Sequence, residues 1–194
     1  MLFRKKNEFQ PDRTRSGVLS NLYITKKQRL LLLRWLLTAL VLAGVSVLQD
    51  VILSRFHIWG ATTDLLCGAL LLVCILLDPE QGCIFILTGS CLYWFSGSAP
   101  GPYVIAMLTV IGLFFSIFRQ GYLRQNFATT VLCTVVAIFT YELVLASTGI
   151  FLGNTTLARL PQFALCGLFT AAVMPALYPV FRSIGKIGGE SWTE

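Results

Sequence analysis

The sequence predicts an all-α integral membrane protein, a compact bundle of about six transmembrane helices whose second and third members are short. Hydrophobic residues make up 56% of the chain and charged residues only 12%. A water-soluble domain of this size would rarely bury so much apolar sequence. A spanning helix takes roughly 20 residues to cross ~30 Å of hydrocarbon, so 194 residues hold five or six spans with short connections.

The charges divide the chain into a basic N-terminal arm (1–29), a polytopic membrane domain (30–182) and a short tail (183–194). The first apolar segment is expected to act as an uncleaved anchor, because it is too long for a signal peptide and no small-residue cleavage site follows. A basic arm can bind nucleic acid, but beside a membrane span it favours a cytoplasmic flank near anionic lipid. We therefore expect lipid, and no nucleic acid, at the following residues: Arg4, Lys5, Lys6, Arg13, Arg15, Lys26, Lys27 and Arg29.

The first span is expected over Leu30–Leu53, with Arg34 and Trp35 near its inner end. A long cation can reach the interface there and an indole can lie among headgroups. Residues 54–63 then form a short external connection. Asp64 opens the next apolar run, in a position suited to an N-terminal helix cap or first-turn residue.

The next two apolar segments, Leu65–Leu77 and Cys83–Phe95, have thirteen residues each and are joined by the turn 78–82. At ~1.5 Å per residue each reaches only about 20 Å. They form either two spans in a locally thinned bilayer or a hairpin that does not cross fully. Both alternatives return the chain to the side it left. We expect protein neighbours to hold this hairpin, with Gly89 at a close helix contact.

The remaining spans follow a Gly/Pro/Ser loop (96–102) that cannot continue a helix. In the last span Pro175 and Pro179 should bend or fray the inner end. With the N-terminus inside, thirteen of the fifteen Lys and Arg residues face the cytoplasm, which places both termini there. The expected spans are Tyr103–Phe118, Phe127–Thr148 and Pro161–Phe181.

Glu142 lies within the fifth span, in its outer half. A carboxyl inside a membrane is costly and suggests a function. Three roles stay open: a structural hydrogen bond or contact with a wet surface, the binding of a partner or ligand, and proton-coupled transport.

A second polar group maps to the outer membrane boundary. It could form the rim of a small-molecule pocket, or it could be interfacial charge and helix capping. Its members are Gln49, Asp50, Arg55, His57, Asp64 and Arg159.

The sequence shows no catalytic or cofactor motif. The six cysteines lie in apolar segments without a Cys-x-x-Cys pair, and His57 is the single histidine, so no metal or disulfide framework is indicated. Asp50 and Asp64 are a conceivable intramembrane aspartyl pair without a supporting motif. We expect no enzyme activity, no metal and no cofactor.

One stretch, 47–120, carries a recognisable series of short motifs. Leu48-Gln49 ends the first span, Phe56-His57-Ile58-Trp59-Gly60 forms the linker, and Thr63-Asp64-Leu65 opens the second helix; Gly89, Tyr93 and the loop 96–102 follow. In these features the chain resembles the bacterial rod-shape-determining MreD family. That family usually has proline in place of Thr63 and an aspartate in place of Tyr93. If the aspartate carries a partner contact, that contact is altered here.

The resemblance implies a scaffold of the elongation machinery in the bacterial inner membrane. Its partners would be MreC, through helix packing, and indirectly MreB filaments, RodA and a class B penicillin-binding protein. Helix faces would grip a partner's membrane anchor while the basic arm stays near anionic lipid or the cytoplasmic filament. The candidate partner-contact residues are Gln49, Asp64, Gly89, Ser96, Gly97, Gly101 and Glu142.

The family is similar in architecture to the substrate-binding subunits of energy-coupling-factor vitamin transporters, which supply the alternative function. Both are small bundles of about six helices without an ATPase of their own. A vitamin binder should carry a polar, aromatic-lined pocket with an ordered outer lid. A scaffold should show an apolar groove and little ligand affinity.

Overall fold

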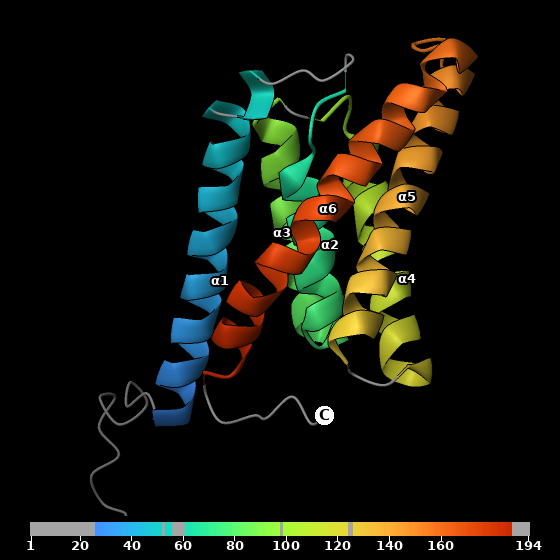
Figure 1. Cartoon of the computed structure of the whole chain (residues 1–194). Coiled ribbons are helices and arrows are strands. Elements are labelled where there is room, and N and C mark those ends of the chain that lie inside the picture. Colours follow the sequence, from blue (N-terminus) through green and yellow to red (C-terminus); the bar gives the residue numbers. More distant parts are fainter. Residues whose placement is uncertain (1–25, 52, 56–60, 98, 124–125, 188–194) are drawn as a thin grey trace, which may run out of the picture.

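The computed structural model describes residues 26–51, 53–55, 61–97, 99–123 and 126–187. Successive long helices run in opposite directions along one bundle (Figure 1), which confirms the predicted all-α class. The elements are α1 (Lys26–Val51), the 3-10 turn η2 (Leu53–Arg55), α2 (Leu65–Leu76), α3 (Pro79–Phe95), α4 (Tyr103–Tyr122), α5 (Phe127–Phe151), the 3-10 turn η3 (Leu157–Arg159) and α6 (Leu160–Gly185).

The two ends of the bundle are named here after the residues that mark them. At the Asp64 end α1 ends and α2 begins; at the Arg119 end α2 ends and α3 begins. Helix α1 starts and α6 finishes at the Arg119 end (Figure 1), so the described part of the chain enters and leaves on the same side. Most of the predicted arm (1–25), the linker 56–60 and the tail residues 188–194 lie outside the described residues.

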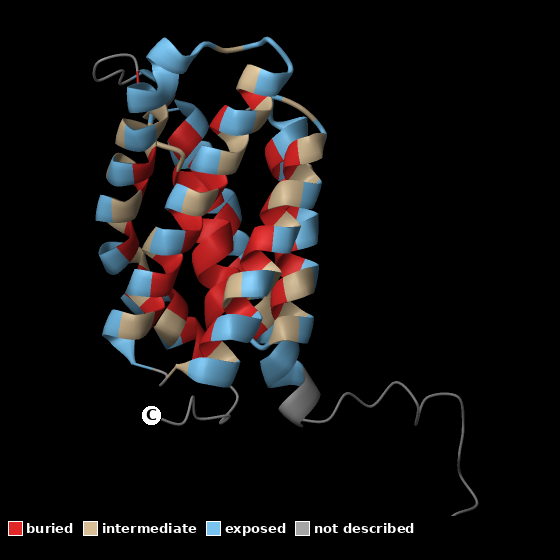
Figure 2. Cartoon of the chain, turned by 90° about the vertical axis from the view of Figure 1, so that its right-hand side faces the viewer, coloured by how far each residue is buried: buried red, intermediate tan, exposed pale blue. Residues whose placement is uncertain are grey.

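Four helical segments are long and apolar enough to cross a membrane. Their outer faces carry many exposed large hydrophobic residues, while the buried residues face the interior (Figure 2). Such a surface is unfavourable in water and matches lipid chains. The chain is therefore a multi-pass membrane protein, with the long apolar segments at Arg29–Val51, Tyr103–Tyr122, Phe127–Phe151 and Leu157–Gly185.

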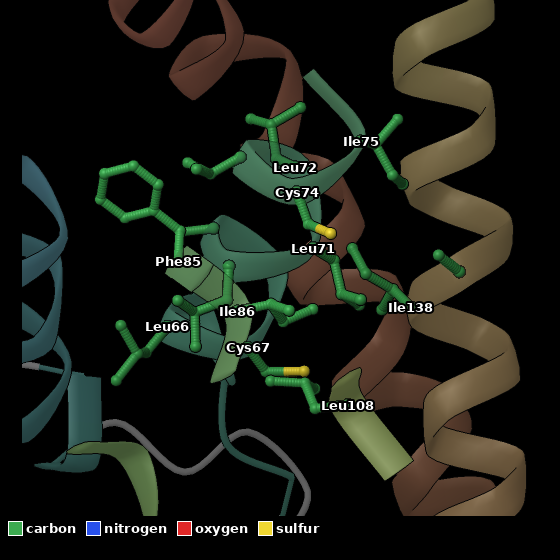
Figure 3. Packing of buried hydrophobic residues seen from close by; sticks show 14 of the residues in the cluster. Leu66, Cys67, Leu71, Leu72, Cys74, Ile75, Phe85, Ile86, Leu108 and Ile138 are labelled. Carbon is green, nitrogen blue, oxygen red and sulfur yellow. The ribbon is translucent and has the colours of Figure 1, made fainter. Parts of the chain in front are cut away.

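Helix α2 lies at the centre of the bundle. All twelve of its residues are buried, and it contacts each of the other five α-helices. Figure 3 shows its side chains gathered with Phe85 and Ile86 of α3, Leu108 of α4 and Ile138 of α5. Twelve residues reach only about 18 Å, short of the hydrocarbon thickness. Other helices of the protein, and not lipid, therefore surround α2, the first arm of the hairpin, as expected.

The second arm of the hairpin differs from the first. Helix α3 has seventeen residues because it begins at Pro79, four residues before the predicted start at Cys83. Proline suits the first helical position, where its missing N–H costs no hydrogen bond. One face of α3 packs on α2, and the other leaves Ile84, Leu87 and Leu92 exposed.

Two glycines allow the central helices to approach closely. A Cβ on Gly89 would lie 2.1 Å from Cδ2 of Leu70, and one on Gly112 would lie 2.1 Å from Cδ1 of Ile86. No side chain fits at either position without displacing its neighbour. The predicted helix contact at Gly89 is thus confirmed, between α3 and α2.

The last helix does not end at its prolines. Helix α6 continues through Pro175 and Pro179 to Gly185, beyond the predicted end at Phe181. Neighbouring packing supports this segment: the ring of Tyr178 lies edge-on to that of Phe127 of α5, with centroids 4.8 Å apart. Of the two predicted effects of the prolines, fraying is wrong, because contacts with α5 hold the helix where local propensity would end it, and bending stays a prediction.

Candidate functional site

A polar network at the Asp64 end is built on the first turn of α2. Oδ1 of Asp64 accepts a hydrogen bond from the backbone N–H of Cys67 at 3.4 Å, which confirms the predicted helix cap. Gln49 of α1 contributes both ends of its amide: Nε2 donates to Oδ1 of Asp64 at 3.3 Å, and Oε1 accepts from the N–H of Leu66 at 2.6 Å. The first N–H groups of a helix have no partner within it, so Gln49 both satisfies α2 and ties α1 to it.

Two further helices form hydrogen bonds with Asp64, one to its carboxyl group and one to its backbone. The hydroxyl of Tyr93, near the end of α3, donates to Oδ2 of Asp64. The backbone N–H of Asp64 donates to Oγ1 of Thr170 of α6 at 3.1 Å. Tyr93 and Thr170 are both buried. Four helices therefore meet at Asp64. An ionised carboxylate in place of the Tyr93 hydroxyl could not donate this hydrogen bond.

A pocket of about 380 Å³ lies beside this network. Its volume falls in the range of cavities that bind small organic molecules. On its α5–α6 side the carboxyl group of Glu142 accepts a hydrogen bond from the thiol of Cys166. The lining residues come from every long helix except α2, together with the connections at this end: Gln49, Ala61, Thr62, Thr63, Asp64, Tyr93, Pro100, Tyr103, Glu142, Leu145, Gly149, Asn154, Thr155, Arg159, Gln162, Phe163 and Cys166.

The pocket has more acidic than basic groups. Asp64 and Glu142 both line it, and Arg159 is the one basic residue among the lining residues, which all belong to the described ranges. Burial raises the pKa of Asp64 above its ordinary value of 3.8, while hydrogen bonds from Tyr93, Cys67 and Gln49 act in the opposite direction. Within the described ranges, no group of three His, Cys, Asp or Glu side chains is placed to hold a metal ion.

The structure separates the candidate residues into three sets. Gln49, Asp64 and Glu142 come together around the pocket. Ser96, Gly97 and Gly101 lie at the same end in the α3–α4 connection, where Ser96 and Gly97 are exposed. Gly97 has a φ of 77°, a conformation that favours glycine, so the turn after α3 explains this residue.

The third set is Gly89 alone, buried between α2 and α3. Among the boundary residues that the sequence groups together, Arg159 lines the pocket with Gln49 and Asp64, whereas Asp50 and Arg55 do not. His57 lies outside the described residues.

Sequence reasoning missed several residues of the site. Cys166 and Thr170 lie four positions apart, on one face of α6, and such a polar pair in an apolar span was a usable signal. Tyr103 directly follows the Gly/Pro loop and also lines the pocket. Hydropathy alone did not indicate these residues as part of a site, because each lies in an otherwise apolar segment.

No protein-family model, curated protein or solved structure matches this chain.

Proposed function

We propose that the chain is a non-enzymatic membrane scaffold of the bacterial cell-wall elongation machinery, needed for rod shape and lateral peptidoglycan synthesis. One observation carries the proposal: residues of the motifs that resemble the MreD family contact one another. Gln49 lies near the end of the first span and Asp64 opens the second helix, and Gln49 donates a hydrogen bond to Asp64. Tyr93, which also donates to Asp64, stands where the family has an aspartate and adds nothing to the resemblance. Motif residues that contact one another in the structure support a related fold. Similarity between apolar segments that do not contact one another would be weaker support.

The scaffold sits in the bacterial inner membrane with its Arg119 end toward the cytoplasm. Seven of the nine described Lys and Arg residues lie at that end, and only Arg55 and Arg159 lie at the other. This asymmetry is the one that cytoplasmic ends of membrane proteins show. The basic arm then lies beside anionic lipid or the cytoplasmic filament.

The partner contact is an MreC-like membrane anchor that packs on the end of α3. Ser96 and Gly97 are exposed there, and so are Leu92 and Phe95 in the last turn of the helix just before them. Large apolar residues beside small ones provide a surface on which another helix can pack in lipid. MreB filaments, RodA and a class B penicillin-binding protein join the assembly through that partner.

Depletion of the protein in its host tests the scaffold role. The cells should become round or wide, and labelled side-wall synthesis should disperse. Normal rods after complete depletion would contradict the proposal.

Copurification tests the partner contact. Phe95→Ala should reduce recovery of the MreC-like partner from native membranes, because Phe95 is 75% exposed at the proposed contact. Phe114→Ala is the matched control, since Phe114 is 62% exposed on α4, away from this contact. Equal recovery with both variants would show that the partner does not bind at the end of α3.

The pocket favours a second candidate function, a substrate-binding membrane subunit of a vitamin transporter of the energy-coupling-factor type. Its polar groups and the rings of Tyr93, Tyr103 and Phe163 are those that a small-molecule binder requires. Loss of uptake of a specific vitamin in depleted cells that remain rod-shaped would favour this candidate. Loss of proton-dependent uptake in Glu142→Gln, with partner binding retained, would do the same.

A further inference from the structure

We infer that the pocket at the Asp64 end binds a small organic cation, with the carboxylate of Glu142 as its principal anionic contact. The inference rests on the pocket alone and adds a ligand class to either function proposed above.

Glu142 has unused capacity to accept hydrogen bonds. The residue is only 4% exposed, yet it lines the pocket. Its described hydrogen bond comes from the thiol of Cys166, which is a weak donor. A carboxylate offers about four acceptor positions, so most of those on Glu142 remain open to a ligand.

Asp64, in contrast, is already engaged by the protein. Gln49, Cys67 and Tyr93 all donate to its two oxygens. Asp64 therefore contributes negative potential to the pocket more than a direct contact. Glu142 is the carboxyl group with room for a new donor.

The charge around the two carboxyl groups favours a cation. Arg159, the basic residue of the lining, is exposed and so lies nearer the solvent. A buried carboxylate without a cation is costly, and an ammonium group in the pocket would offset that cost.

The remaining lining residues suit an organic cation. Tyr103 and Phe163 line the same cavity as Glu142, and aromatic rings attract cations. The cavity of about 380 Å³ is far larger than a dehydrated metal ion needs. The described residues also lack a third acidic, His or Cys ligand that would complete a metal site with these two.

Matched pairs of ligands test the inference on the full chain in a neutral maltoside detergent. The first pair is choline and its uncharged isostere 3,3-dimethyl-1-butanol; the second is benzylamine and benzyl alcohol. A ligand that binds the folded state raises the thermal midpoint in proportion to its occupancy. At least one cation should raise the midpoint and give a calorimetric binding isotherm, and its alcohol should not.

Two variants locate the site. Glu142→Gln should weaken binding of the cation by about tenfold or more, the usual effect of losing a charged hydrogen-bond partner. Glu80→Gln makes the same change at an exposed residue of the Arg119 end and should leave binding unchanged. If Glu142→Gln does not fold, the comparison of each cation with its alcohol on the unaltered chain still decides the outcome.

Three results would overturn the inference: no binding of either cation up to about 10 mM, equal binding of cation and alcohol, or equal weakening by both variants. Failure of the inference and failure of the scaffold proposal are separate observations. If the chain binds no cation but still restores rod shape to depleted cells, only the ligand inference fails. If the chain binds a cation but depleted cells stay rod-shaped, only the scaffold proposal fails.

Discussion

Arg119 of α4 donates a hydrogen bond from Nη1 to the carbonyl oxygen of Ile75, near the end of α2, at 2.7 Å. The next residue, Gln120, donates from Nε2 to the carbonyl oxygen of Leu77 at 3.0 Å. The last carbonyl groups of a helix lack partners within it, and a cation there also complements the helix dipole. With Asp64 at its other end, α2 has a carboxyl group at its N-terminus and a guanidinium at its C-terminus, although it is buried throughout.

Arg119→Met should destabilise the fold by about 1–3 kcal/mol, because it leaves a buried carbonyl group unpaired while keeping a long apolar side chain. The measurement is thermal or denaturant unfolding in detergent. Lys186→Met is the control, since Lys186 is exposed at the same end. Equal stability of the two variants would show that the contact with Ile75 contributes nothing.

Gln49→Leu should cost about 1–3 kcal/mol, because the N–H of Leu66 loses its acceptor in a buried position. The same residue donates to Asp64, so the effects of Gln49→Leu and Asp64→Asn should be coupled. A double-mutant cycle should give an interaction energy of roughly 0.5–3 kcal/mol. Strict additivity would argue against a shared network.

Gly89→Ala should destabilise the bundle by about 1–3 kcal/mol, because the new methyl group overlaps the buried side chain of Leu70. Leu70→Ala alone should also be costly, since it leaves a cavity. The double variant should be less destabilised than the sum of the two, because each change relieves the other. Gly44→Ala is the control: Gly44 is exposed on α1 and a Cβ there would meet no neighbouring atom.

The raised pKa of Asp64 predicts a pH dependence of stability. Because the folded pKa lies above the ordinary value of 3.8, the folded state retains this proton to a higher pH than the unfolded state does. The stability contributed by protonated Asp64 is complete below pH 3.8 and is lost as the pH rises through the folded pKa.

Asp64→Asn isolates this contribution, since its amide does not titrate. As the pH rises above the ordinary pKa of 3.8, the unaltered chain should lose stability relative to Asp64→Asn, and the difference should level off once the folded pKa of Asp64 has been passed. The difference between their unfolding midpoints is the quantity to measure. A difference independent of pH would mean that burial does not dominate the titration of Asp64.

The proposed orientation predicts which end a membrane-impermeant maleimide reaches in intact cells. A cysteine at Leu157, an exposed residue of the Asp64 end, should be labelled without permeabilisation. A cysteine at Lys186, exposed at the Arg119 end, should be labelled only after permeabilisation. The native cysteines are buried or half-buried, and the unaltered chain measures their background. The reverse pattern would invert the topology.

The sequence by itself determined the helices and their alternation. Hydropathy located all six α-helices, the Asp-Pro turn separated α2 from α3, and Asp64 could be recognised as a cap from its place before an apolar run. These features depend on local propensity and on the exclusion of charge from lipid, so a single chain segment contains the information. The helix contact at Gly89 was also readable, because small residues in a membrane mark close approach.

Only the tertiary structure decided which helix is central and which polar residues meet. From the sequence, α2 and α3 are similar short apolar arms, yet α2 is enclosed by the other helices and α3 keeps an exposed face. The meeting of Gln49, Tyr93 and Thr170 at Asp64, and of Glu142 and Cys166 at one pocket, joins residues from four helices and the start of α2. Hydropathy records how apolar a segment is but not the direction in which each side chain points. The pairing of buried polar groups is set when helices pack, because each must find its partner among whichever neighbours the fold supplies.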